Sequence, residues 1–532
     1  MPLHILISDH LPPAGWNLLR ADPTLTLSGP FTARAQTLAA LPTADALLIR
    51  STTLVDEELL RAAPRLKVIA RAGARLDNVD LDAATRKGIL VLNAPDANLL
   101  AIAEHTLALL LALARHIPQG HNAVHAGRWP RHDILGFQLH GKTMGILGFG
   151  RLGKEIAARA RAFGMTVLAY DPYADLSFAR ERSVEITGFP ELLARADILV
   201  LATAPTTTRF DPTPADPLLS ADAFQQIKPG AILINAAHAG LVDETALLAA
   251  LDAGTLAGAA LDVFDTEPPT GRLPAHPRVL VTPHLNQNTV ESQTTTSLQI
   301  VRDTLDALRG HDYRNVVNLP FDDRIPYATA KPYLHLATRL GKLLGQTADG
   351  WITRMEVELL GDARDLVRPV AATLLAGMIR PTNGSPVNWV NAPVLAHEQG
   401  LVTTQAKHLL DLPDYPNALI CRVAWGSESR TVAGVLFANG EARVVHYDGF
   451  SIDAPPEGFV LILENDDVPG VIGKVGTLLG RAGINIANWR YGRETRGGRA
   501  LSFISLDARA PQTLLRELEN EPEIRRARLV RL

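Results

Sequence analysis

The chain has 532 residues, of which 47% are hydrophobic and 20% charged, an ordinary globular composition with enough length for three or four domains. Its net charge of −4, from 52 basic and 56 acidic residues, gives no reason to expect nucleic acid or a membrane surface as partner. A single cysteine, Cys421, excludes an internal disulfide and fits a reducing cytoplasm, and the N-terminal residues resemble a first strand more than a signal peptide.

The first third of the chain alternates short apolar runs with helical segments, which predicts a parallel sheet. We expect strands at 4–8, 46–50, 66–70 and 90–93, and helices at 12–20, 56–62 and 82–87. The most apolar run, 99–114, contains Glu104 and His105 and is too short to span a bilayer. It is therefore predicted to belong to a buried helix, over 99–116.

Residues 142–172 are predicted to form a dinucleotide-binding unit. Gly148, Gly150 and Gly153 give G-x-G-x-x-G directly after an apolar strand at 143–147, and a helical pattern follows over 152–163. Asp171 ends the next strand, eighteen residues after Gly153, where an acid can bind both ribose hydroxyls. A carboxylate there repels a 2′-phosphate, so NAD is favoured over NADP.

Further alternation continues the parallel sheet. We expect strands at 198–202, 232–235, 258–263 and 279–282, and helices at 191–194, 244–253 and 291–309. These elements predict a Rossmann-type NAD-binding domain at 99–284, inserted in a flavodoxin-like substrate-binding domain made of 1–98 and 285–316, with a cleft between the two.

The regular alternation of predicted strands and helices ends near residue 315, and a different order of elements follows. Predicted helices at 333–344 and 367–375, with strands at 353–360, 428–437, 442–447 and 450–451, indicate an α+β domain at 317–454 without a catalytic constellation. From 457 to 532 the expected order is βαββαβ, which predicts a ferredoxin-like domain.

Several passages carry a family resemblance. LDNVDLDAATRKGILVLNAP, GILGFGRLGKEIAARARAFGM, GLVDETALLAALDAGTLAGAALDVFDTEPP and TPHL resemble the D-isomer-specific 2-hydroxyacid dehydrogenases. PVNWVNAPVLAHEQGL and NDDVPGVIGKVGTLLGRAGINIA resemble the additional regulatory domain and the terminal ACT domain of the long-form D-3-phosphoglycerate dehydrogenase family. The resemblance extends over nearly the whole chain.

This resemblance implies NAD-dependent oxidation of 3-phospho-D-glycerate to 3-phosphohydroxypyruvate, the entry to serine synthesis. His284 matches the family's acid/base histidine, Glu267 matches its paired glutamate, and His238 occupies the position of its catalytic arginine. The base is needed because the C2 hydroxyl loses its proton as hydride leaves C2. No metal is implied.

The resemblance also assigns residues to each ligand. The implied NAD contacts are Gly148, Gly150, Arg151, Leu152, Gly153, Asp171, Thr203, Ala236, Ala237 and Asp262. The implied substrate contacts are Arg50, Arg71, Ala74, Arg75 and Arg131. Asp467, Pro469, Gly470 and Asn485 match the effector loop and its asparagine, and suggest L-serine as effector.

The sequence departs from the family at the substrate site. His238 replaces an arginine, and an imidazole offers one aligned donor and a charge that fades above about pH 6.5. Arg75 interrupts a glycine loop that should approach the carboxylate by its backbone, and Asn286 stands in a small-residue segment after the catalytic histidine. A further departure lies at 202–204, followed by a longer polar segment at 206–216.

Two accounts of these departures stay open. In one, Arg75 supplies the lost guanidinium; in the other, activity is redirected or lost, and Arg75 points into solvent. The functional alternatives are accordingly a dehydrogenase for another anionic D-2-hydroxy acid, or a catalytically impaired regulatory paralogue. The family likeness further predicts a homodimer or homotetramer.

Overall fold

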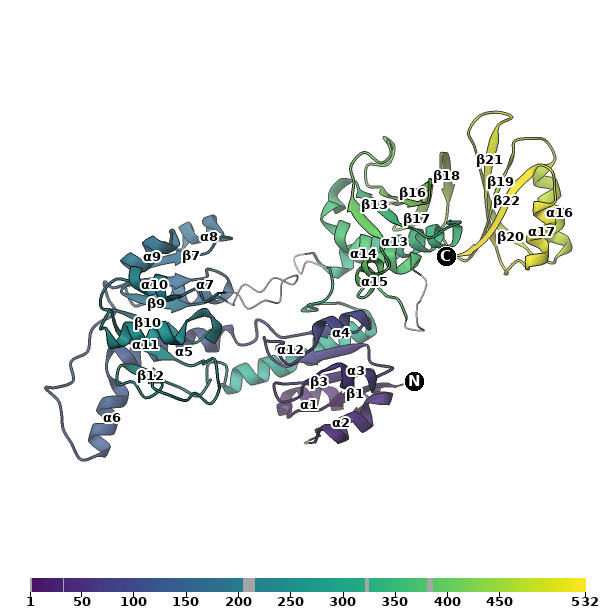
Figure 1. Ribbon diagram of the computed structural model, residues 1–532. Coiled ribbons are helices and arrows are strands. Elements are labelled where there is room, and N and C mark those ends of the chain that lie inside the picture. Colours follow the sequence, from purple (N-terminus) through teal and green to yellow (C-terminus); the bar gives the residue numbers. More distant parts are fainter. Residues whose placement is uncertain (1, 32, 204–215, 321–324, 380–385) are drawn as a thin grey trace. The chain divides into compact units, whose positions relative to one another are not determined.

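The computed structural model describes residues 2–31, 33–203, 216–320, 325–379 and 386–532. The chain forms two compact units (Figure 1). One contains Met1–Leu11, Trp16–Asn93 and Ile300–Leu532, and the other contains Pro12–Gly15 and Ala94–Gln299. The boundaries fall near, but not at, the predicted domain boundaries, which stay predictions.

The second unit is built around a seven-stranded parallel sheet with strand order β12-β11-β10-β9-β6-β7-β8. Its strands are β6 (Thr143–Leu147), β7 (Thr166–Tyr170), β8 (Glu185–Ile186), β9 (Ile198–Leu201), β10 (Ala231–Asn235), β11 (Leu256–Leu261) and β12 (Val279–Val281). The strand order reverses between β6 and β9, which is where open α/β sheets bind their ligands.

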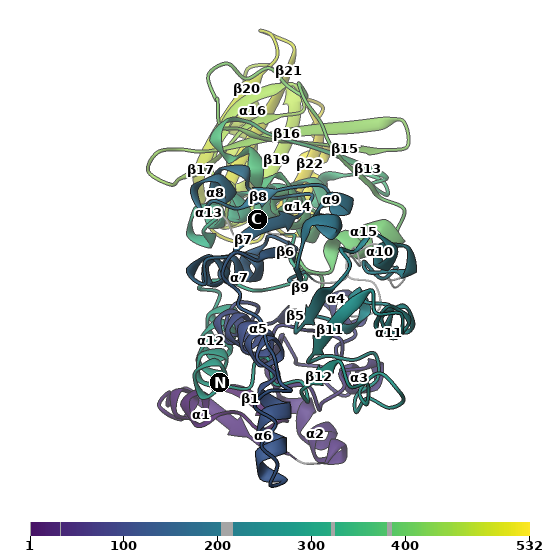
Figure 2. The same ribbon diagram turned by 90° about the vertical axis from the view of Figure 1, so that its left-hand side faces the viewer.

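Helices cover both faces of this sheet, because alternate residues of each strand point to opposite sides. One buried cluster joins the sheet to α5 (Leu99–Ala114), α7 (Arg151–Ala162) and α8 (Leu176–Glu181). The other joins it to α9 (Phe189–Arg195), α10 (Ala221–Gln226) and α11 (Glu244–Asp252). Figure 2 shows α5 and α7 on one side of these strands and α9, α10 and α11 on the other.

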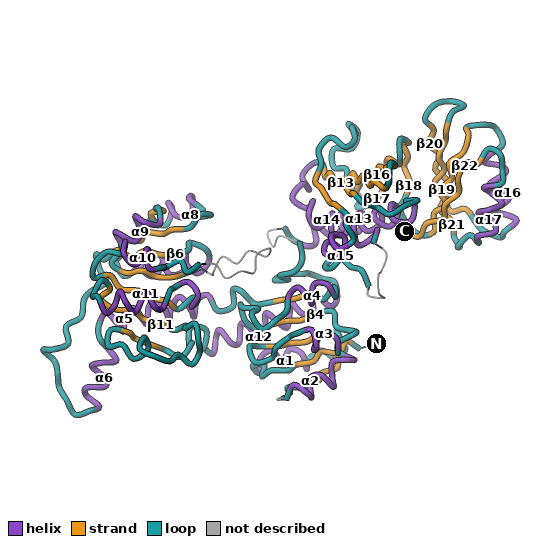
Figure 3. Tube along the Cα trace, in the orientation of Figure 1, coloured by secondary structure: helices purple, strands orange, loops and turns teal. Residues whose placement is uncertain are grey.

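The N-terminal part of the first unit, here named the substrate domain after its predicted role, is a five-stranded parallel sheet with order β2-β1-β3-β4-β5. Its strands are β1 (Leu3–Ile7), β2 (Leu25–Ser28), β3 (Ala46–Ile49), β4 (Val68–Arg71) and β5 (Leu90–Leu92). Its helices are most of α1 (Pro13–Arg20), α2 (Arg34–Ala40), α3 (Glu57–Arg61), α4 (Leu81–Arg86) and the second half of the long α12 (Val290–Arg309), with a 3-10 turn η1 (Leu41–Thr43). Figure 3 shows how helices and strands alternate in this part.

The intervening region combines a six-stranded sheet, order β14-β13-β15-β16-β17-β18, with a pair of helices. Its elements are α13 (Tyr327–Thr347), β13 (Arg354–Leu359), η3 (Gly361–Leu366), α14 (Val367–Met378), α15 (Ala392–Glu398), β14 (Val402–Gln405), β15 (Leu419–Trp425), β16 (Glu428–Leu436), β17 (Ala442–Tyr447) and β18 (Phe450–Ala454). Gly341 and Gly377 let α13 and α14 approach closely, since a Cβ on Gly341 would lie 2.2 Å from the Leu374 carbonyl oxygen.

The C-terminal region has the predicted βαββαβ order and an antiparallel sheet, β20-β21-β19-β22. Its elements are β19 (Phe459–Asp466), α16 (Val471–Arg481), β20 (Ile486–Arg493), β21 (Arg499–Leu506), α17 (Gln512–Glu519) and β22 (Ile524–Arg531). Both helices cover the same face of this sheet (Figure 1). Residues from β19, β21 and β22 share one buried cluster with the intervening region.

Several sequence predictions need correction. The predicted helix at 99–116 ends at Ala114, and α6 (Ile117–His125) begins after a left-handed His116, φ +49°. The helix predicted from 333 begins six residues earlier, at Tyr327, and contains Pro332. Strands β2, β8, β14 and β15 and helices α2, α8, α10 and α15 were not predicted, because they are short or, like β15, buried on both faces and without alternation.

The apolar composition of α5 raises the question of whether this helix could cross a membrane. Among the described residues no single helix is long and apolar enough to cross a bilayer. The pair α5 and α6 passes by length and composition together but bends by 62° at the break between them.

Candidate active site

The Gly-rich turn lies between β6 and α7 and has the shape that a pyrophosphate needs. Gly148 is left-handed, φ +102°, and a Cβ there would lie 2.7 Å from the Thr203 Cβ. A Cβ on Gly153 would lie 2.1 Å from the Gly148 carbonyl oxygen, so only glycine lets α7 pack so close to the strand. Gly150 has no atom within 4 Å of a Cβ position and leaves open space at the helix N-terminus.

Asp171 lies beside this turn, at the end of β7. Its carboxylate accepts hydrogen bonds from the Phe149 N–H at 2.8 Å and from the Tyr173 N–H at 2.8 Å. These bonds fix the acid next to the turn without using all its acceptor sites. Arg151, the first residue of α7, pairs with Asp96, and Leu152 packs against the sheet. The residues therefore fit a bound dinucleotide.

His284 and Glu267 are brought together at the ends of two loops. The Nδ1 atom of His284 lies 2.9 and 3.0 Å from the two carboxylate oxygens of Glu267. One oxygen of Glu267 also accepts from the Phe264 N–H at 3.3 Å. His284 has a positive φ, +54°, which is uncommon for a residue with a Cβ and is held by the loop around it.

Asp262 holds the segment on both sides of His284. Its fully buried carboxylate accepts from the Thr282 hydroxyl at 2.6 Å and from the N–H groups of Leu285 and Asn286 at 2.8 and 2.9 Å. The His105 Nε2 on α5 lies 3.2 Å away. Burial by itself raises the pKa of Asp262, but the bonds from His105, Thr282, Leu285 and Asn286 together outweigh it and bring the pKa below its ordinary value.

The segment that carries His238 follows β10 and is shaped by Asn235. The Asn235 side chain accepts from the N–H groups of Ala237 and His238 and donates to the His238 carbonyl at 2.9 Å. Asn286 donates its amide to the Ala236 carbonyl at 2.8 Å. The loops after β10 and β12, which carry the two histidines, are thus bonded to each other.

Three arginines gather at the carboxyl ends of β3 and β4 in the other unit. Arg71 ends β4 and pairs in register with Ile49, the residue before Arg50. Burial lowers the pKa of Arg71, and the nearby charges of Arg75 and Arg50 lower it further while Asp77 opposes them. Positive charges so close together repel one another, and an anion bound among them offsets this repulsion.

Neighbouring polar groups position these arginines. Asn78 accepts from Arg71 Nε at 3.1 Å and donates to the Arg50 carbonyl at 2.7 Å. Arg75 pairs with Asp77 at 3.3 Å and is 42% exposed, and the Ala74 carbonyl accepts from Asn93 at 2.6 Å. The predicted role of Arg75 therefore stays a prediction, as does that of Arg131, which is exposed on the loop before β6.

Sequence reasoning missed Asn78, Asn235 and His105 as site-building residues. Asn235 is the last residue of β10 and Asn78 lies in the loop after β4, and a polar residue at such a place is a usable signal in a parallel sheet. His105 gave no such signal, because only packing of α5 against the sheet brings it to Asp262. Of the segment 206–216, only Asp216 lies within the described residues.

Comparisons with known proteins identify three family domains along this chain. Residues 107–286 match the NAD binding domain of D-isomer specific 2-hydroxyacid dehydrogenases, 329–448 match the D-3-phosphoglycerate dehydrogenase intervening domain, and 459–523 match the ACT domain. D-3-phosphoglycerate dehydrogenase of Bacillus subtilis is 38% identical over 92% of this chain and 93% of its own length. The enzyme of that name from Synechocystis is 35% identical over 99% of this chain and 94% of its own length.

The chain belongs to the D-3-phosphoglycerate dehydrogenase family. Among solved structures, the TT0316 protein of Thermus thermophilus is similar over 59% of this chain and all of its own, with a TM-score of 0.53 and 34% identity. The predicted fold class, an α/β dehydrogenase with a Rossmann-type domain followed by an α+β region and an ACT domain, is confirmed. The NAD cofactor predicted from the Gly-rich turn is confirmed with it.

The family's ACT domain carries the predicted effector residues in two places. Asp467 accepts from the Tyr491 hydroxyl at 3.0 Å and from the Gly497 N–H at 2.9 Å, and these bonds lower the pKa of Asp467, the Gly497 bond most. Pro469 and the left-handed Gly470 precede α16, and Asn485 donates to Asp507 at 2.6 Å.

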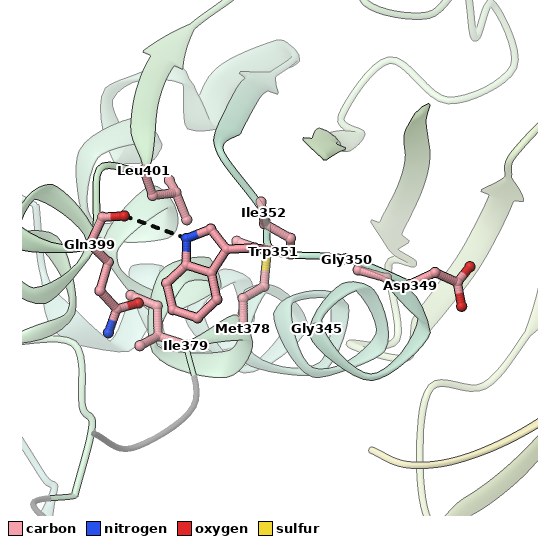
Figure 4. A pocket seen from close by; sticks show the side chains of 10 residues that line it. Gly345, Asp349, Gly350, Trp351, Ile352, Met378, Ile379, Gln399 and Leu401 are labelled. Atoms are coloured by element: carbon pink, nitrogen blue, oxygen red, sulfur yellow. Dashed lines mark hydrogen bonds between the residues drawn. The ribbon is translucent and has the colours of Figure 1, made fainter. Parts of the chain in front are cut away.

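The intervening domain has a small cavity of about 290 Å³ beside the contact with the ACT domain (Figure 4). The Trp351 indole lies above Met378 and Ile379 and donates to the Gln399 carbonyl at 3.4 Å. Asp349, at the edge of this cavity, pairs with Arg526 and Arg528 of β22, the second at 2.7 Å. The intervening and ACT domains are thus joined by charge as well as by a shared apolar cluster.

Proposed function

We propose that this chain oxidises 3-phospho-D-glycerate to 3-phosphohydroxypyruvate with NAD, the first step of phosphorylated L-serine synthesis. The observation that carries the chemistry is the imidazole–carboxylate pair of His284 and Glu267, with the bond distances of 2.9 and 3.0 Å. The relatives that share nearly the full length of this chain bear the name of that activity.

His284 acts as the base. Because Nδ1 faces both oxygens of Glu267, this nitrogen carries the proton and donates it, which leaves Nε2 to accept the proton of the C2 hydroxyl. Glu267 then stabilises the imidazolium that forms. When bound, NAD accepts the hydride that leaves C2. Asp262 keeps the His284 loop in place through its bonds to Thr282, Leu285 and Asn286.

Gly148, Gly150, Gly153, Arg151 and Leu152 hold the pyrophosphate end of NAD in this proposal, and Asp171 binds the adenosine ribose. Thr203, Ala236, Ala237 and Asp262 belong to the nicotinamide end. The support for this assignment is the sheet order: Asp171 follows β7 on one side of β6, while Thr203, Ala236 and Asp262 follow β9, β10 and β11 on the other.

The substrate is an anion in this proposal, held by Arg50, Arg71, Arg75 and Arg131, with His238 and the Ala74 backbone serving its carboxylate. The proximity of the first three residues supports the assignment. Arg71 and Arg75 approach the same carboxylate, Asp77, at 4.0 and 3.3 Å, and Asn78 bonds both the Arg71 side chain and the Arg50 carbonyl.

Steady-state NADH production tests the function. We expect turnover of 3-phosphoglycerate, with glycerate and 2-hydroxyglutarate much slower, and a Glu267→Gln enzyme that loses about 10² to 10⁴ in kcat/KM. Glu181→Gln, an exposed carboxylate on α8, is the control. Equal rates with glycerate would show that the enzyme does not recognise the phosphate. A fully active Glu267→Gln enzyme would show that the His284–Glu267 pair is not needed for the reaction.

L-serine is proposed as an effector of the ACT domain, at Asp467, Pro469, Gly470 and Asn485, and the enzyme as a homodimer or homotetramer. Trp129 and Leu135, which are 79% and 87% exposed, are apolar groups suited to a second copy. Inhibition by L-serine but not D-serine, and the mass of the particle by light scattering, test these two proposals.

A further inference from the structure

A second, larger cavity opens at the other end of the substrate-domain sheet. It has a volume of about 630 Å³ and is lined by residues that begin strands: Asp45 precedes β3, Lys67 precedes β4, and Leu90 begins β5. Arg71 ends the second of these strands, and Arg50 directly follows the first. Since the strands are parallel, the cavity lies at their amino ends and the substrate arginines lie at their carboxyl ends. The length of four strand residues, or roughly 13 Å, separates the two.

The lining of this cavity is strongly basic. It contains four cationic side chains, Arg61, Arg65, Lys67 and Lys87, and one carboxylate, Asp45, which leaves a net charge of +3 in a chain whose overall charge is −4. Asp45 is 2% exposed and is already shared by Arg65 at 3.4 Å and Lys67 at 3.2 Å.

The other two cations have little to hold them. Among the residues that the structure describes, Arg61 makes one ion pair, an exposed contact with Glu57 one turn before it, and such a contact is worth little. Lys87 makes no ion pair with any residue in the described part of the chain. Positive charge is therefore in excess in this cavity, and an added anion would meet it without displacing a buried partner.

The intervening domain supplies the opposite wall. Asn388 donates to the Gly88 carbonyl at 2.8 Å, and Trp389 and Val390 pack against the substrate-domain cluster. The cavity thus also has an apolar part, which includes Leu66, Leu308 and Trp389. A volume of this size suits a whole small molecule instead of a lone ion.

We propose that this cavity binds a phosphorylated small molecule. Its phosphate lies among Arg61, Arg65, Lys67 and Lys87, and its carbon body packs against Leu66, Leu308 and Trp389. A dianionic phosphate matches the charge excess better than a single carboxylate does, and guanidinium and ammonium groups together are the usual donors to its oxygens.

This site regulates the enzyme from behind the substrate arginines. A ligand there contacts both the substrate domain and the intervening domain, and it touches Asp45 and Lys67, which directly precede the strands that lead to Arg50 and Arg71. Occupancy therefore tightens the junction between these domains and changes the apparent affinity for substrate.

Calorimetric titration of the full-length protein with inorganic phosphate and with glycerol 1-phosphate, at constant ionic strength, tests the proposal. We expect Arg61→Gln/Lys87→Gln to weaken binding of both probes by about tenfold or more, since each lost charged hydrogen bond is worth about a factor of ten. The ester should bind more tightly than inorganic phosphate, because its carbon body adds apolar contacts.

The matched control removes two exposed arginines outside the cavity, Arg272→Gln/Arg354→Gln, and should leave both titrations unchanged. NADH formation in phosphate-free buffer should stay within about twofold in the cavity variant, which shows that it folds. Superimposable titrations of wild type and cavity variant would overturn the site, and an ester that binds no better than phosphate would overturn the organic ligand.

Discussion

His284 and His238 are both imidazoles, but their surroundings give them different tasks. His284 has a carboxylate on Nδ1 at 2.9 Å, which fixes its tautomer and supports a base. His238 lies in a segment shaped by Asn235, and the sequence predicts that it takes the place of the family's catalytic arginine. Its imidazole presents a positive charge to an anion only while it is protonated.

The affinity for substrate should therefore depend on pH. If His238 binds the carboxylate, the apparent KM for 3-phosphoglycerate rises as pH increases from about 6 to 8, because an ordinary imidazole loses its charge in that range. His238→Arg keeps its charge and should flatten the profile. KM measured against pH in both enzymes checks this, and a wild-type profile as flat as that of the arginine enzyme contradicts it.

Arg75 is the other residue whose task is open. It lies with Arg71 and Arg50 but pairs with Asp77 across 3.3 Å. If Arg75 replaces the family's guanidinium, Arg75→Ala should raise KM for substrate by tenfold or more, roughly the worth of a charged hydrogen bond, and leave NAD affinity intact. Arg20→Ala, which stacks on Trp16, is the control. An unchanged KM would leave Arg75 as a surface residue.

At the scale of elements, each strand end places one part of the site. The turn after β6 holds the glycines, the end of β7 holds Asp171, and the loops after β10 and β12 carry the two histidines. The physical reason is that parallel strands all present their carboxyl ends at one edge, so residues distant in sequence meet there.

Asp171 should set the choice of cofactor. Asp171→Ser removes the negative charge that repels a 2′-phosphate, and it also removes one acceptor for the ribose hydroxyls. The ratio of NADP to NAD affinity should therefore rise by tenfold or more. Asp222→Ser, an acid in the first turn of α10, is the control. Fluorescence titration with both cofactors measures the ratio, and an unchanged ratio would separate Asp171 from the ribose.

Asp262 should make the stability of its unit depend on pH. Its folded pKa lies below the ordinary value, so its contribution is present above about pH 4 and is lost as pH falls through the folded pKa. Asp262→Asn should cost about 2–3 kcal/mol at pH 7, the worth of hydrogen bonds to a buried charge, and the difference from wild type should shrink toward pH 3. Thermal midpoints of both proteins across this range check the sign; a gap that widens on acidification argues against it.

At the scale of the whole molecule, the first unit joins the sheet that carries Arg71 to the intervening and ACT domains. The substrate domain meets the intervening domain at Gly88 and Asn388, and the intervening domain meets the ACT domain through Asp349 and a shared apolar cluster. A chain of direct contacts therefore runs from the ACT sheet to the sheet that carries Arg50 and Arg71.

A substitution at Gly88 tests whether the junction between the substrate and intervening domains contributes to stability. It has φ +72°, and a Cβ there would lie 2.5 Å from Asn388 Nδ2 and 2.9 Å from Asn391 Nδ2. Gly88→Ala should lower stability by about 1–2 kcal/mol through backbone strain alone, and more through the lost junction. Gly400→Ala has the same strain, φ +74°, with nothing within 4 Å, and should show only the smaller loss. Equal thermal midpoints for the two variants would mean that the junction contributes nothing.

The sequence by itself determined the elements whose signals are local. The Gly-rich turn and Asp171, the strand–helix alternation and the βαββαβ order of the ACT domain depend on residues within a few tens of positions of each other. His284 and Glu267, seventeen residues apart, could be proposed as a pair from motifs and are found in contact.

Only the tertiary structure decided what depends on distant residues packing together. His105 meets Asp262 because α5 lies on the sheet, Asn78 ties Arg50 to Arg71, and the basic cavity collects side chains from Asp45 to Val390. Periodicity reports which face of an element is buried, but not which element buries it. Contacts of long sequence separation are fixed by packing of whole layers, so no local pattern contains them.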